Sequence, residues 1–147
     1  MILVVGYGNI MRCDDAAGIF VVQKISEEKI PHVKTTTAHQ LHVEMLEEAV
    51  GCDTVILVDA AEEGEELVFR KVERFPSSQM VSSHHMTPEL FLELARTIYH
   101  ADLNLYLCSI RGEYFETGAT LSSQVLLRVQ KAAGLIRNFI VKESAYA

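Results

Sequence analysis

The sequence predicts a three-layer α/β/α domain with a mostly parallel sheet of about five strands. Two observations predict it. Short apolar runs alternate along the chain with longer stretches of helical period, and the runs at residues 2–5 and 55–58 are apolar at every position. Such alternation is typical of βαβ units, and strands that helices cover on both faces are apolar throughout. No repeat, low-complexity segment or linker interrupts residues 1–147, so we interpret the chain as a single domain.

Local patterns predict the elements of the first half. Residues 2–5 indicate a buried strand that Gly6 ends. Residues 15–28 carry apolar side chains at three-residue spacing and predict a helix, whereas the Thr-rich residues 34–38 predict a second strand. A short helix is expected at residues 43–50, before the buried strand at residues 55–58.

The second half adds two strands and two helices. Residues 67–72 are more amphipathic than the buried strands and are expected at an edge of the sheet. A helix is expected to begin at Pro88 and to end near Tyr99, because Thr87 is a good N-cap and proline suits the first helical position. Residues 103–110 predict the fifth strand, and residues 122–140 predict the longest helix.

Composition limits the function before any motif is considered. With 49% hydrophobic residues the chain is too apolar for disorder, and no apolar run approaches the roughly 18 residues of a membrane span. A net charge of −7 repels phosphate backbones, which disfavours nucleic acid as a partner. Three cysteines without CxxC spacing, and a start without the basic segment of a signal peptide, favour a cytoplasmic protein with reduced thiols.

The long loop after the first strand is the first segment with notable chemistry. Gly6 and Gly8 are spaced as in a nucleotide-binding loop, but the third glycine of that pattern is absent, and Asp14 and Asp15 would repel a pyrophosphate. A small nucleotide-binding domain is therefore the weakest function considered. One of the two carboxylates is expected to cap the following helix, and Cys13 has no evident base that would make it a nucleophile.

Two further segments carry candidate residues. Ligands of an open α/β sheet bind beyond the carboxyl ends of its parallel strands. Asp59 directly follows a buried strand, and His84 and His85 precede the third helix. Together Asp15, Asp59 and His84 offer two carboxylates and one imidazole, a set that suits a divalent ion such as nickel or zinc and leaves a position for a substrate.

Three motifs resemble those of the hydrogenase maturation endopeptidases, which process the large subunit of nickel–iron hydrogenases. They are, in order, Gly6-x-Gly8-Asn9 followed by Asp14-Asp15-x-x-Gly18, the segment Ile56-Leu57-Val58-Asp59-Ala60, and Ser83-His84-x-Met86. The motifs have the family's order and spacing over nearly the whole chain. The resemblance implies an α/β fold with a twisted five-stranded sheet.

The resemblance also implies a metal-binding set. The family's positions are an acid at the end of the first loop, an acid that ends the central strand, and a histidine. They correspond to Asp15, Asp59 and His84 in this sequence. Met86 favours His84, because the family has a large aliphatic residue two positions after the ligand.

Two assignments near this set stay undecided: which histidine is the ligand, and whether the turn after the second strand contributes to the site. Counting back from Pro88, instead of from the aliphatic residue, favours His85 over His84 as the ligand. The turn after the second strand departs from the family's glycine-rich form, and His39 in that turn is a candidate to face the site.

The function that the resemblance implies is removal of a short C-terminal extension from a nickel–iron hydrogenase large-subunit precursor, once nickel has been inserted. Our hypothesis is that Asp15, Asp59 and His84 bind nickel that the precursor already holds, and so act as both metal-binding and catalytic residues. Three alternatives stay open: nickel polarises the carbonyl of the adjacent peptide bond, nickel activates a water, or an uncoordinated carboxylate such as Asp14 acts as the base. The main alternative is a non-catalytic sensor or chaperone of the same precursor. The sequence leaves the oligomeric state open.

Overall fold

A computed structural model describes residues 1–74 and 86–145 of the chain. Its centre is a five-stranded sheet in the order β2-β1-β3-β5-β4. The strands are β1 (Ile2–Tyr7), β2 (Val33–Ala38), β3 (Thr54–Ala61), β4 (Leu67–Lys71) and β5 (Leu105–Arg111). All neighbours pair in parallel except β4, which is antiparallel to β5 at one margin of the sheet. The predicted fold class is confirmed, and so is the edge position of the amphipathic strand.

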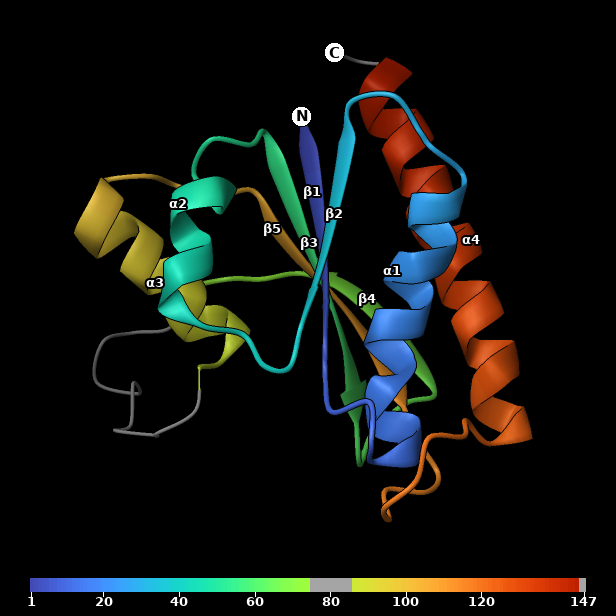
Figure 1. The fold of residues 1–147 in the computed structure, drawn as a ribbon. Helices are drawn as coiled ribbons and strands as arrows, with labels where there is room; N and C mark the ends of the chain where they lie inside the picture. The colour runs from blue at the N-terminus through green and yellow to red at the C-terminus, as the bar shows by residue number, and fades with distance from the viewer. Residues whose placement is uncertain (75–85, 146–147) are drawn as a thin grey trace.

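Helices cover both faces of the sheet (Figure 1). One face carries α1 (Ala17–Glu27) and α4 (Ser123–Ala145), and the other carries α2 (Leu46–Ala49) and α3 (Pro88–Tyr99). Each face buries its own apolar cluster. Val4 and Ile56 belong to the cluster under α1 and α4, whereas Leu3 and Leu57 belong to the one under α2 and α3. Successive residues of a strand point to opposite faces, which explains why residues 2–5 of β1 and 55–58 of β3 are apolar at every position.

Two helix predictions differ from the structure in detail. The helix expected at residues 43–50 is a 3-10 turn (η2, Val43–Met45) followed by the single turn α2. Leu46 and Ala49 are the residues of this segment that the core buries, and one helical turn is enough to place both. The first helix begins at Ala17 after a second 3-10 turn (η1, Cys13–Ala16), not at residue 15.

The predicted start of α3 is confirmed. The Thr87 hydroxyl oxygen accepts a hydrogen bond from the backbone N–H of Leu90 (3.1 Å), and Pro88 is the first helical residue. Within residues 1–74 and 86–145 no helix combines the length and the apolar character that crossing a membrane requires.

The topology decides where the candidate residues meet. β1 and β3 are neighbours at the centre of the sheet, and Gly6 pairs with Val58. The two strands therefore end at the same edge. This edge brings the loop that contains Asp15 next to Asp59.

Candidate active site

Close packing fixes the loop that follows β1. Gly8 has a φ of +152°, and a Cβ there would lie 2.0 Å from the carbonyl oxygen of Asp15. A Cβ on Gly18 would lie 2.2 Å from the carbonyl oxygen of Val58 in β3. The glycines therefore let the loop fold against itself and let α1 approach the sheet. This role differs from an open phosphate cradle, and it disfavours the nucleotide-binding interpretation.

Asp15 and Asp59 reach one cleft from two different elements. Asp15, in η1, is half-buried, and its Oδ2 accepts a hydrogen bond from the backbone N–H of Asn9 (2.8 Å). Asp59, near the end of β3, is also half-buried, and its Oδ1 accepts a hydrogen bond from the N–H of Ala60 (2.8 Å). Between described residues each carboxylate accepts this one hydrogen bond, so these residues use only a small part of its capacity as an acceptor.

The electrostatics of Asp59 mark it as a site residue. Burial raises its pKa, the hydrogen bond from Ala60 acts in the opposite direction, and the charge of Asp15 raises it further, to about 7. Desolvation and a like charge are both relieved when a cation binds between two carboxylates. The pair therefore has the chemistry of a cation site, and perturbed carboxylates of this kind are concentrated at functional sites.

The cleft has a volume of about 200 Å³. Its walls come from the ends of β1 and β3, from the turn after β2 and from the residues before α3, and they are formed by Tyr7, Gly8, Asp15, His39, Gln40, Leu41, Asp59 and Met86. His39 thus faces the site. His84 and His85 lie outside the described residues, but Met86, which follows them directly in the sequence, lines the cleft.

Sequence reasoning missed Tyr7. This residue is 7% exposed and lines the cleft. Burial, and then the charges of Asp59 and Glu89, raise its pKa far above the ordinary value of a phenol. The hydroxyl consequently stays protonated and is a hydrogen-bond donor at any physiological pH. Its position between Gly6 and Gly8 in the first motif was the one signal in the sequence.

Asp14 has a structural role and is not part of the cleft. It is 0% exposed and does not line the cleft. Its Oδ2 accepts hydrogen bonds from the N–H groups of Glu113 and Tyr114 and from the Ser122 hydroxyl, and its Oδ1 accepts one from the Ser122 N–H, all at 2.8 Å. Burial alone would raise the pKa of Asp14, but these hydrogen bonds outweigh it and lower the pKa.

The helix-capping prediction for these two acids is wrong. Neither η1 nor α1 has a side-chain cap at its start. Asp14 instead joins the start of the chain to the loop before α4, about 100 residues away, because four donors converge on it there. Asp15 turns its carboxylate back to Asn9.

Only part of the predicted metal-binding set lies among the described residues. Among residues 1–74 and 86–145, no three His, Cys, Asp or Glu side chains are arranged to hold a metal ion. Asp15 and Asp59 supply two oxygen ligands, and the third predicted ligand, His84, lies in the part of the chain not described. Cys13 is buried and does not line the cleft.

Comparisons of the sequence identify no relative, since no family model and no curated protein matches the chain. Comparison with solved structures finds proteins of similar fold. The chain is similar to the hydrogenase maturating endopeptidase HybD from E. coli, with a TM-score of 0.77 and 19% identity, over 97% of this chain and 93% of that one.

Two archaeal structures are also similar. The NiFe hydrogenase maturation protease HycI from Thermococcus kodakarensis KOD1 has a TM-score of 0.73 and 22% identity, over 92% of this chain and 88% of that one. The hydrogenase 2 maturation peptidase from a Thaumarchaeota archaeon has a TM-score of 0.69 and 22% identity, over 95% and 97%. These likenesses show that the chain has the fold of these proteins over nearly its whole length.

Proposed function

We propose that this protein is an endopeptidase that removes the C-terminal extension of a nickel–iron hydrogenase large-subunit precursor after nickel insertion. The observation that carries the proposal is the pairing of Asp15 and Asp59. Two acids from separate sequence motifs line one cleft, in a chain with the fold of HybD and HycI. The free thiols of all three cysteines are consistent with a reaction in the cytoplasm.

In this proposal nickel belongs to the precursor and is part of what the cleft recognises. Asp15 and Asp59, together with His84, contribute the ligands that the precursor leaves open. The fold holds the two carboxylates close enough for Asp15 to raise the pKa of Asp59, and a divalent cation removes that repulsion. A precursor without nickel brings no such cation, so the cleft distinguishes loaded from empty precursors by charge.

The protein's own groups then orient the peptide. Ligands on a rigid sheet edge fix the metal, and the peptide bond next to it is thereby held in one place, which lowers the entropic part of the barrier. The protonated hydroxyl of Tyr7 offers a donor in the same cleft. Asp14 is saturated with hydrogen bonds, so we assign it to holding the loop and not to moving a proton.

The proposal is tested by the intact mass of a large-subunit precursor after incubation with this protein, with and without prior nickel loading. We expect the loss of one defined C-terminal peptide from the nickel-loaded precursor alone. Asp59→Asn should slow this loss at least about 1,000-fold, equivalent to about 4 kcal/mol of transition-state stabilisation. Glu62→Gln is the matched control, because Glu62 is exposed, follows β3 and does not line the cleft.

Two results would contradict the proposal. A fully active and stable Asp59→Asn variant would remove Asp59 from the site. Unchanged precursor mass despite a stable complex with the nickel-loaded form would favour the non-catalytic sensor or chaperone.

A further inference from the structure

β2 forms one margin of the sheet, and no described strand pairs with its outer side. On its inner side, the carbonyl oxygens of His32 and Ala38 accept hydrogen bonds from backbone N–H groups of the β1 segment (2.9 and 3.1 Å). In a parallel ladder the residues of a strand alternate between bonding inward and facing outward. Thr35 and Thr37 therefore direct their backbone N–H and C=O groups away from β1.

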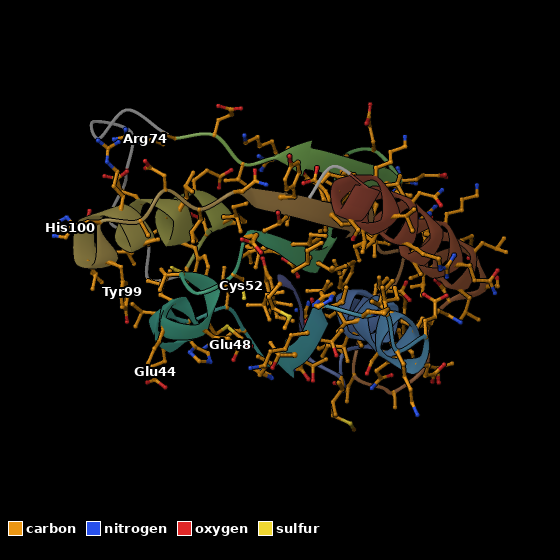
Figure 2. The ribbon with its side chains drawn as sticks, turned by 90° about the horizontal axis from the view of Figure 1, so that it is seen from above. Glu44, Glu48, Cys52, Arg74, Tyr99 and His100 are labelled. Carbon is orange, nitrogen blue, oxygen red and sulfur yellow. The ribbon has the colours of Figure 1, made fainter. Side chains whose placement is uncertain are left out.

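A groove of about 260 Å³ lies beside this margin, on the face that α2 covers. Leu3, Val5 and Met45 contribute apolar surface to it, Glu44 and Glu48 contribute carboxylates, and His42 also lines it. Glu48 is already paired with Lys34 of β2 (3.5 Å), so Glu44 is the carboxylate that the groove offers to a ligand. Glu44 belongs to η2 and Glu48 to α2, and Figure 2 shows this helical segment on the side of the molecule where β2 forms the margin, with β4 at the opposite margin. An apolar floor with a carboxylate at its wall fits a side chain with a long apolar stem and a cationic head.

The margin of β2 leads directly to the cleft. β2 ends at Ala38, and the residues that follow, beginning with His39, line the cleft together with Asp15 and Asp59. Neighbouring strands lie about 4.8 Å apart, so a strand added outside β2 would run about 14 Å from β3. An extended chain of about four residues spans that distance.

We propose that the outer edge of β2 binds the C-terminal extension of the precursor as an added strand, with a lysine or arginine of the extension in the groove. This inference rests on the proposed function and adds how the peptide is held. Backbone hydrogen bonds to Thr35 and Thr37 supply affinity for any extended sequence, and the groove supplies the preference for a basic side chain. The cleaved bond then lies about four residues from the docked strand.

Proline substitutions separate this role from general damage to the sheet. Thr37 is exposed, and Thr37→Pro removes an outward N–H while the bonds to β1 remain, as edge strands allow. Lys71→Pro is the matched control on the other margin. The carbonyl of Glu66 and the N–H of Val72 both bond to β5 (3.0 and 2.8 Å), so the alternation of the ladder places the N–H of Lys71 outward.

Initial rates on the nickel-loaded precursor, measured over a range of concentrations, give kcat and KM separately. We expect Thr37→Pro to raise KM about tenfold and to change kcat little, because one peptide-binding hydrogen bond is lost. Glu44→Gln should raise KM about twofold, as expected for an exposed charge pair. Lys71→Pro should leave both constants at the wild-type values.

Each other outcome has a distinct meaning. If the wild-type protein cleaves no precursor, the proposed function fails. If the wild type cleaves and Thr37→Pro keeps its KM, the docking proposal is overturned. A wild-type dimer that Thr37→Pro converts to a monomer in sedimentation, at unchanged KM, would assign the edge to a second copy of this chain.

A peptide probe covers the case in which Thr37→Pro does not fold. A synthetic peptide with the sequence of the extension should inhibit cleavage by the wild-type protein. N-methylation of one alternate set of its residues should abolish inhibition, whereas methylation of the other set should preserve it. Equal inhibition by both methylated peptides would overturn the proposal.

Discussion

Asp14 and Asp59 are two acids withdrawn from solvent, and their surroundings move their pKa values in opposite directions. Four hydrogen bonds converge on Asp14 and lower its pKa. Asp59 accepts one such bond from a described residue, and burial and the neighbouring charge of Asp15 raise its pKa to about 7. Among residues 1–74 and 86–145, the fold thus supplies four hydrogen bonds to the Asp14 carboxylate and one to that of Asp59. A carboxylate that lines a cleft with a raised pKa indicates a functional residue.

The comparison also separates two acids that are adjacent in the sequence. Asp14 and Asp15 share one 3-10 turn, yet only Asp15 lines the cleft. Successive side chains of such a turn point in different directions, so one acid can anchor the loop while the next one faces the site. If this division is correct, substitutions of Asp14 should affect stability, and substitutions of Asp59 should affect the site.

The largest expected effect on stability is that of Asp14→Asn. An amide has one acceptor oxygen instead of two and no charge, and its NH2 group would face backbone N–H donors. We expect a loss of about 3 kcal/mol in the free energy of unfolding, since buried donors to a charged group lose their partner. Urea denaturation at pH 7 measures it, and an unchanged slope with denaturant would show that the unfolded state is not altered.

Asp15→Asn is the control for that measurement, because it changes the adjacent acid, which lies in the cleft. We expect its free energy of unfolding to stay within about 1 kcal/mol of the wild type. The pH dependence gives a second check. The lowered pKa of Asp14 stabilises the folded protein above the pKa that this acid has in the unfolded chain, and this contribution is lost as the pH falls through the folded value. Equal losses for both variants would contradict the division.

Asp59→Asn should raise the free energy of unfolding near neutral pH, whereas Asp14→Asn should lower it. The raised pKa of Asp59 means that the folded protein binds a proton more tightly than the unfolded chain does. Stability is therefore unaffected below the unfolded pKa of about 4 and falls as the pH rises to about 7, where the folded acid also ionises. We expect the free energy of unfolding of Asp59→Asn, relative to the wild type, to increase by about 2 kcal/mol between pH 5 and pH 8.

Unfolding measured at these two pH values tests the expectation directly. Glu62→Gln, an exposed acid just beyond β3, should show no comparable change with pH. A variant that is more stable and yet inactive would agree with a site residue that is kept at the expense of stability. An Asp59→Asn protein that is less stable than the wild type at pH 8 would mean that Asp59 supports the fold, as Asp14 does.

Much of the fold could be predicted because its signals are local. Residues 2–5 and 55–58 are apolar at every position since both faces of β1 and β3 are covered, and Thr87 with Pro88 marks the start of α3. The short segment before β3 was predicted less well. Only Leu46 and Ala49 of that segment are buried, which is too little to fix a longer helix against the 3-10 alternative.

Some residues of the candidate site could likewise be predicted from the sequence, and others could not. Asp15 and Asp59 could be chosen because one lies in the loop after β1 and the other near the end of β3, and these two strands end at the same edge. The role of Asp14 could not, because its partners Glu113, Tyr114 and Ser122 lie about 100 residues away and no periodicity or spacing records that contact. Tyr7 could not be predicted for another reason. A tyrosine between two glycines indicates no particular role in the sequence, and only the structure shows that it lines the cleft.

The smallest expected effect tests whether Asp15 and Asp59 share one electrostatic site. Burial is the main cause of the raised pKa of Asp59, and the charge of Asp15 adds to it. Asp15→Asn should therefore lower the pKa of Asp59 and leave it above its ordinary value. The carboxyl carbon of Asp59, followed by NMR from pH 4 to 9, reports this shift. Glu62→Gln should leave the titration unchanged. If Asp15→Asn also leaves it unchanged, the two carboxylates do not sense each other, and the cleft would lose the charge repulsion that a divalent cation relieves.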